Sequence, residues 1–523
     1  MIAGRVIMGG ARGQIGMGKS YRAILRAGAC ALALAGTAGA ARAESLADAI
    51  RLAYHTNPSL QQQRAQLRIT DETYVQARAG YRPTSNLSAS AQWQWQRLGT
   101  ARCTVFAGVT SCGDQSPENN NLGATLSLNQ PIYTGGRTTA RVQSAVADIL
   151  AGREDLRRAE GQLMLNVIQA YVDVRRDEQA LAIRKENVAV LQRQVDETRA
   201  RFDVGEVTRT DVAQSEAQLA LAQSQLSTAQ AQLAISRAAY ASVVGQSPGT
   251  LEPEPGFKVF PDNVDQAFDT AQQNGPLIRA ADYAEQGAGA RVAEARAARL
   301  PTVGLQASYG YDQPLHPFDS GLNVRTFTAG VTVSQPIFSG GAVSSQIRQA
   351  LEQENIARIQ LEQARRTTVE DISQAWNRLL AARASISAGE EQVRAARIAF
   401  EGTRAEQQVG LRTTLEVLSA EQVLRDSELQ LINARHDEYV ASATVLNVMG
   451  LLEAKDLVAD IDLVPGSHAV GQLRHTTGYI PGLEDAVQAI DSIGAPSIRK
   501  LPPPVDAPIT TGQAAEAAAA GAR

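Results

Sequence analysis

Two copies of one short stretch decide how this chain folds. Gln130–Gly136 has the sequence QPIYTGG, and Gln335–Gly341, 205 residues later, has the sequence QPIFSGG. The same offset separates Val204-Gly205 from Val409-Gly410. Self-similarity at a fixed spacing is typical of a duplicated structural unit. We therefore predict that the 523-residue chain contains two copies of one fold.

Each copy is followed by a long stretch without proline, at residues 132–247 and 337–464. Both stretches are rich in Ala, Gln, Leu, Glu and Arg, which favour helices. Within them, residues 137–203 and 342–408 form runs of 67 residues, which correspond to helices about 100 Å long. Apolar residues recur at three-and-four spacing along these runs, as in helices that pack along coiled-coil seams.

Each long helix is predicted to end at its Val-Gly pair, and a second helix, at 210–244 or 414–449, is predicted to run back beside it. Glycine is the residue that a helix C-cap favours, and threonine is a good N-cap. The first copy offers Thr208 or Thr210 as the N-cap of the returning helix, and the second copy offers Thr413 or Thr414. The sequence therefore predicts two long helical hairpins.

Four segments alternate apolar and polar residues with period two: 84–96, 122–129, 302–311 and 326–334. An apolar face that includes aromatic residues and an uncharged polar face are typical of outer-membrane barrel strands. A soluble antiparallel sheet packed on one face is the alternative. A bilayer tolerates no open sheet edge, and bacterial barrels start at about eight strands. Closure would therefore need eight strands from two chains or twelve from three, so the membrane interpretation predicts an oligomer.

Residues 1–43 have the composition of an export signal. They contain six basic side chains and no acidic one, an apolar stretch over 27–41, and Ala41-Arg42-Ala43 as a small-x-small cleavage site. The apolar run of about 15 residues is shorter than the roughly 20 that span a bilayer. We predict cleavage after Ala43, and Met17 is an alternative start.

The remaining chain has 44 basic and 54 acidic side chains, which corresponds to a net charge of −10. It contains no dense Lys/Arg run, which excludes nucleic acid as the main partner. A GxxxxGKS pattern occurs at 13–20, but it lies in the signal and lacks the strand and helix that phosphate binding requires. The five histidines have no metal-ligand spacing. We therefore expect neither catalysis nor a metal or cofactor.

The first copy has 13 more residues than the second between Pro83 and Gln130, and Cys103 and Cys112 lie in this insertion. In an exported chain, two cysteines without a nearby His or third Cys indicate a disulfide more than a metal pair. We predict that Cys103 and Cys112 form a disulfide in a cell-surface loop between the first two strands.

A strand pair, a long helix, a Val-Gly break and a returning helix, twice over in an exported chain, resemble the TolC family of outer-membrane efflux and type I secretion channels. The resemblance covers about residues 44–452 and is most specific at Val409–Leu418 (VGLRTTLEVL), whose partner is Val204–Val212. It implies a homotrimer, with a twelve-stranded β-barrel in the lipid of the outer membrane and a twelve-helix tunnel, an α-barrel, across the periplasm. The implied fold is mainly α with a transmembrane β part, and each chain supplies four strands.

The resemblance also implies partners and site residues. A periplasmic adaptor (membrane fusion) protein and an inner-membrane transporter would meet the channel at the hairpin tips, which are Val204, Gly205, Val409 and Gly410.

A gate is the second implied site. In the family, a basic residue just after the second Val-Gly is tethered to an acidic residue of the first hairpin and holds the tip shut. These positions match Arg412 and Asp211, and an acidic ring at the constriction matches Glu416. A bracing tyrosine of the family would fall at Gln407 and a second acidic ring at Ser419, so we expect a less tightly held closed state. From the residues alone, Arg412 would be a solvated charge at a helix end.

The expected organisation is a signal peptide at 1–43, a first repeat at 44–250, a linker at 251–263, a second repeat at 264–452, and a partly disordered C-terminal tail at 453–523. The expected function is a channel-tunnel that exports small molecules or proteins across the outer membrane together with a pump. Drug efflux and type I protein secretion are both compatible with this duct. A soluble periplasmic coiled-coil scaffold is the alternative.

Overall fold

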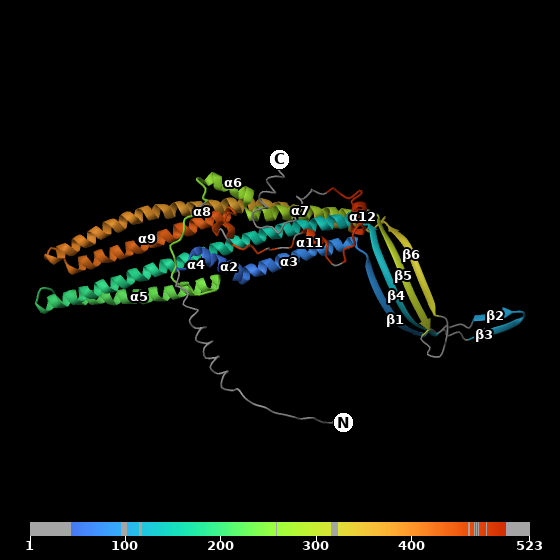
Figure 1. Ribbon diagram of the computed structural model, residues 1–523, viewed down its shortest axis with the longest axis horizontal. Helices are drawn as coiled ribbons and strands as arrows, with labels where there is room; N and C mark the ends of the chain where they lie inside the picture. Colours follow the sequence, from blue (N-terminus) through green and yellow to red (C-terminus); the bar gives the residue numbers. More distant parts are fainter. Residues whose placement is uncertain are drawn as a thin grey trace, which may run out of the picture.

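The computed structural model describes residues 43–497, except for 96–101, 114–117, 258, 315–322, 459–460, 465, 467, 469 and 477. The predicted signal peptide therefore lies, apart from Ala43, outside the described residues. The molecule is elongated, with two helical hairpins at one end and a β-sheet at the other (Figure 1).

Two long helices run through most of this length. They are α4 (Arg137–Asp203) and α8 (Ala342–Gln408), each of 67 residues, as the sequence predicts. The returning helices are α5 (Arg209–Val244) and α9 (Thr414–Val448). Each long helix begins after a glycine with positive φ, 79° at Gly136 and 85° at Gly341, which lets the chain turn sharply out of the preceding segment.

Shorter helices precede each pair of strands. The first copy has α2 (Leu46–Thr56), α3 (Pro58–Arg78) and the 3₁₀ turn η2 (Ala79–Tyr81). The second copy has α6 (Val264–Asn274) and α7 (Pro276–Ala297). Figure 1 shows α5 and α3 in one row beside α4, with α9 and α7 in a second row beside α8. The helical part is thus built from two equivalent units, in agreement with the duplication. Among the described residues, no helix is both long and apolar enough to cross a membrane.

The sheet consists of β1 (Thr84–Trp95), β4 (Glu118–Tyr133), β5 (Thr302–Pro314) and β6 (Val324–Ser334), all antiparallel and in the order β1-β4-β5-β6. All twelve residues of β1 and all eleven of β6 are exposed, including large apolar side chains. A soluble sheet would bury one face of these strands against a core. The exposed apolar face favours the membrane interpretation over the soluble alternative.

The insertion of the first copy forms a hairpin that the sequence analysis did not predict. It consists of β2 (Arg102–Phe106) and β3 (Val109–Gly113), joined by Ala107 and Gly108, whose φ angles are 51° and 80°. Two successive residues with positive φ match the tight turns that join antiparallel strands.

The described part of the expected tail at 453–523 is folded. This part contains α10 (Ala454–Leu457), α11 (Val470–Arg474) and α12 (Leu483–Asp491). Leu473 and Val487 from this segment are buried together with Tyr74, Tyr81 and Ile149 of the helical body. The segment therefore belongs to the folded core, and residues 498–523 lie outside the described part of the chain.

Candidate functional site

The two hairpin tips have the same backbone turn. In the first, Gly205 has φ of 79°, and its N–H donates to Phe202 O at 2.9 Å while Glu206 N–H donates to Arg201 O at 2.9 Å. In the second tip, Gly410 also has φ of 79°, with bonds from Gly410 N to Gln407 O (3.0 Å) and from Leu411 N to Glu406 O (2.9 Å). This pair of bonds is the Schellman motif that ends a helix at a glycine. The predicted C-caps thus correspond to a defined turn.

Apolar side chains are exposed at both tips. Val204 is 72% exposed, Val409 71% and Leu411 76%. Isolated exposed apolar residues are ordinary on a protein surface. Here, however, they belong to matching turns at the ends of α4 and α8, so both tips expose apolar surface.

A capping box starts each returning helix and uses two of the predicted gate residues. Thr208 accepts from Asp211 N, and the Asp211 carboxylate accepts from Thr208 N at 2.9 Å. Thr413 and Glu416 form the same reciprocal pair, with 2.8 Å from Thr413 N to Glu416 Oε2. Thr208 and Thr413 are therefore the N-caps. The side chains of Asp211 and Glu416 thus accept hydrogen bonds from backbone N–H groups that would otherwise have no partner at a helix start.

Arg412 binds two carboxylates of its own hairpin. Its Nε donates to Glu406 Oε2 at 2.8 Å, and its Nη1 donates to Glu416 Oε1 at 2.9 Å. The bonds with Glu406 and Glu416 raise the pKa of Arg412. Hydrogen bonds from Thr413 N–H, Arg412 and the Thr413 hydroxyl lower the pKa of Glu416, so this carboxylate is ionised at neutral pH. The structure thus brings Arg412 and Glu416 together, and within the described chain Asp211 pairs with Thr208 rather than Arg412.

Gln407, at the position where the family has a bracing tyrosine, makes a contact within the second hairpin. Gln407 is buried, with 6% of its surface exposed, and its Nε2 lies 3.5 Å from the hydroxyl of Thr414 on the returning helix. Ser419, the position of the second acidic ring, is exposed. Gln407 therefore links the two helices of its own tip.

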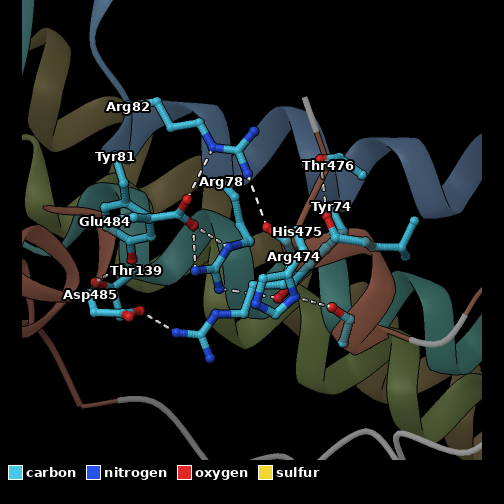
Figure 2. A network of polar contacts seen from close by, with 12 residues as sticks. Tyr74, Arg78, Tyr81, Arg82, Thr139, Arg474, His475, Thr476, Glu484 and Asp485 are labelled. Atoms are coloured by element: carbon cyan, nitrogen blue, oxygen red, sulfur yellow. Dashed lines mark hydrogen bonds and ion pairs between the residues drawn. The ribbon is translucent and has the colours of Figure 1, made fainter. Parts of the chain in front are cut away.

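The second candidate region is the junction between sheet and helices, which Figure 2 shows as a network of polar contacts. The Glu484 carboxylate of α12 binds Arg78, whose Nε donates to Oε1 at 2.5 Å, and Arg82, whose Nε donates to Oε2 at 3.1 Å. All three side chains are at least nine-tenths buried. Arg82 also donates to the carbonyl of Arg474, and Arg474 pairs with Asp485.

Asp491, at the end of α12, caps α4. Its carboxylate accepts from the backbone N–H groups of Thr134 (2.6 Å), Gly136 (3.2 Å) and Thr139 (3.2 Å). Gly136 itself supplies no side-chain cap, so the first turn is capped by the Thr134 hydroxyl, which accepts from Thr138 N–H, and by Asp491, about 350 positions away in the chain. The equivalent junction of the second copy differs, because Ile337 is 97% and Phe338 is 90% exposed.

The sequence analysis missed Arg78, Arg82, Glu484 and Asp491. The available signal was the amphipathic pattern of 483–491, in which Leu483, Val487 and Ile490 share one face. No local pattern predicts which basic residues or helix start this segment meets.

The two cysteines lie opposite each other in the β2–β3 hairpin. Cys103 is disulfide-bonded, and its register partner across the two strands is Cys112. The pairing of Cys103 with Cys112 stays a prediction. Among residues with described positions, no group of three or more His, Cys, Asp or Glu side chains could hold a metal ion.

Comparison with known proteins connects this geometry to a family. Residues 49–246 and 267–451 match the model of the family described as "Outer membrane efflux protein". The outer membrane efflux protein BepC of Brucella suis is 36% identical over 432 residues, which cover 82% of this chain and 91% of that protein. The alkaline protease secretion protein AprF of Pseudomonas aeruginosa is 25% identical over 372 residues, which cover 70% of this chain and 76% of that protein.

A solved structure supports the fold. The outer membrane protein VceC of Vibrio cholerae matches with a TM-score of 0.65 and 24% identity, covering 77% of this chain and 96% of that chain. The match to the family model spans both copies of the duplicated unit.

Proposed function

Because the chain belongs to the outer membrane efflux protein family, it is a channel of the outer membrane, and we propose that an adaptor and an inner-membrane transporter engage it at the two hairpin tips. One observation carries this proposal. An uncovered antiparallel sheet lies at one end of helices of 67 residues, and two equivalent tips with exposed valines lie at the other. Helices of this length extend about 100 Å. A sheet in the outer membrane would thus place the tips deep in the periplasm, within reach of an inner-membrane partner.

Channels of this family are trimers that work with efflux pumps. Three copies of the sheet β1-β4-β5-β6 supply twelve strands. Among the described strands, β1 and β6 each have one unpaired edge, and such edges need partners in a bilayer. Pairing of β6 in one subunit with β1 in the next would satisfy both.

The transported substrate is proposed at the level of class. Relatives carry the names of an efflux protein and of a protease secretion protein. Because relatives with such different names match the same chain, we assign selection of the substrate to the inner-membrane transporter. Small molecules and proteins are both within this proposal.

Two measurements test this function. Purified protein from outer-membrane fractions should run as a heat-resistant trimer and should conduct ions in planar lipid bilayers. Substitution of the exposed tip residues Val204 and Val409 by Asp should abolish export in cells without lowering trimer yield, because only the partner contact is lost. A soluble monomer, or export unaffected by the double substitution, would contradict the proposal.

A further inference from the structure

A buried carboxyl group lies where the two hairpins meet, close to their tips. Glu421 of α9 is 2% exposed, and its Oε1 is buried and has no hydrogen-bond partner among the described residues. One turn earlier on the same helix, Leu418 packs with Leu191 of α4 and Ala222 of α5. Glu421 therefore belongs to the contact between hairpins rather than to the surface of its own.

A small cavity adjoins this carboxyl group. It has a volume of about 10 Å³ and is lined by Asn187 and Leu191 of α4, Gln218 of α5 and Glu421 of α9, among others. This volume is close to the minimum for one water molecule. An ionised carboxylate, which prefers several hydrogen bonds, is poorly accommodated there.

A neighbouring arginine on the same helix binds other carboxylates. Arg425 lies one turn from Glu421, and its Nη1 donates to Glu428 Oε2 at 3.0 Å while its Nη2 donates to Glu186 Oε1 at 3.3 Å. Two further charged groups line the cavity. Arg184 of α4 donates to Gln225 of α5 at 2.8 Å, and Asp426 belongs to α9.

Burial has the largest effect on the pKa of the Glu421 carboxyl group. It raises the pKa of Glu421 to about 7, against the opposing effects of Arg425, Arg404 of α8 and Arg193 of α4, while Glu186 adds to the increase. The group therefore exchanges its proton in the neutral pH range.

The duplication supplies a comparison within the same molecule. Glu216 is the equivalent residue of the first copy, 205 positions earlier. Its side chain is 46% exposed, and it accepts from Arg199 Nη2 at 2.6 Å. Within the single chain, the same residue type at the equivalent position is thus solvated and paired in one hairpin and buried between the hairpins in the other.

A second titratable group faces α4 from the same helix. His436 Nε2 lies 2.9 Å from Asp173 Oδ1, and its Nδ1 lies 2.9 Å from Asp437 Oδ1. Burial lowers the pKa of His436, but the contacts with Asp173 and Asp437 outweigh burial and raise it above its usual value. The contact with Asp173 joins α9 to α4 and favours the protonated form of His436, whereas Asp437 lies on α9 itself.

We propose that Glu421 is a proton-binding residue that sets how tightly the second hairpin packs on the first, and so controls opening of the channel tip. The neutral acid fits the buried contact between the two hairpins. The carboxylate is instead stabilised by hydration when α9 moves away from α4 and α5. The packed state is therefore most favoured at low pH and loses stability as pH rises from 4.5, the usual value of a glutamic acid, to about 7. The ratio of open to packed tips changes by at most about tenfold per pH unit and per site in this window. This inference rests on the proposed channel function.

Single-channel recording of purified trimers in planar bilayers between pH 5 and pH 8 tests this inference. Wild-type open probability should rise several-fold across this range. Glu421→Gln keeps the side chain neutral, so its open probability should stay near the low-pH value and retain only the dependence that His436 contributes. Glu216→Gln, the matched control, should follow the wild-type profile. Glu416 is ionised throughout the range because its pKa is lowered.

The outcomes separate the two proposals. A wild-type protein that does not conduct contradicts the channel function. A conducting wild type whose pH profile is unchanged in Glu421→Gln, or is lost equally in Glu216→Gln, overturns the role of Glu421. If Glu421→Gln fails to assemble, hydrogen exchange of wild-type residues 414–425 gives a second measurement. After correction for the intrinsic rate, exchange should be faster at pH 7.5 than at pH 5.5, and equal rates would overturn the proposal.

Discussion

Gly410 shows how one backbone angle shapes a tip. Its φ is 79°, and a Cβ added there would meet no atom of the described residues within 4 Å, so glycine is required for the backbone conformation and not because space is lacking. Residues other than glycine reach this region at a cost of roughly 1–2 kcal/mol. We expect Gly410→Ala to speed amide exchange at the second tip about five- to thirtyfold. Gly402 also has open space around it but lies inside α8, where alanine is the better helix former. Gly402→Ala should slow exchange, and a shift in the same direction for both variants would contradict this account.

Arg412 has two candidate roles that conductance can distinguish. If it holds the closed tip by binding Asp211 in the assembled channel, Arg412→Ser and Asp211→Asn should each raise single-channel conductance, and the double variant should add little. If it acts only within its own hairpin, Glu406→Gln should reproduce Arg412→Ser, and Asp211→Asn should leave conductance unchanged.

Glu416 permits a separate test of charge at the tip. A glutamine at this position can still complete the capping box with Thr413, so Glu416→Gln removes the charge and keeps the cap. We expect lower cation preference in reversal-potential measurements at an unchanged trimer yield. Equal cation preference in variant and wild type would remove Glu416 from the predicted acidic ring.

At the scale of the element, α12 binds the first copy at the junction between its sheet and its helices. Glu484 binds the buried Arg78 and Arg82, and Asp491 caps α4. Removing one partner of a buried ion pair costs about 3–5 kcal/mol. Glu484→Ala should therefore release α12 and make the segment after Arg474 sensitive to limited proteolysis.

The neighbouring residue provides the control for this change. Asp485 pairs with Arg474, and both side chains are substantially exposed. Exposed pairs contribute at most about 1 kcal/mol, so Asp485→Ala should leave the proteolysis pattern intact. Equal sensitivity in the two variants would show that α12 is held by other contacts.

At the scale of the whole molecule, the junction between sheet and long helix is covered in the first copy and exposed in the second. This difference predicts where subunits meet. α12 covers the junction of the first copy, whereas Ile337 and Phe338 at the second junction are almost fully exposed. Burying a phenylalanine side chain contributes about 1.5–3 kcal/mol. If the adjacent subunit of the trimer covers this junction, Phe338→Ser should lower the temperature at which trimers dissociate in detergent. Phe106, at the β2–β3 hairpin, is 86% exposed as well, and Phe106→Ser should leave that temperature unchanged.

Local patterns in the sequence were sufficient to predict the long helices, the tip turns and the strands. The bounds of α4 and α8, the Val-Gly turns and the four strands follow from proline placement, helix-forming composition and period-two alternation, which act over a few residues at a time. The duplication adds a second, independent copy of each signal, and the conclusion that several chains must combine follows from counting strands.

The contacts that give particular residues their roles needed the folded structure. Glu216 and Glu421 are the same residue at equivalent positions, yet one is solvated and one is buried, because only α9 places that face against the other hairpin. The partners of Arg412 are Glu406 and Glu416 because the turn of the folded hairpin places both carboxylates within reach of its guanidinium group. Asp491 meets the start of α4 across about 350 residues, which no short-range pattern encodes. Burial and long-range pairing depend on which faces meet when the two copies pack, and those faces are set by the whole fold.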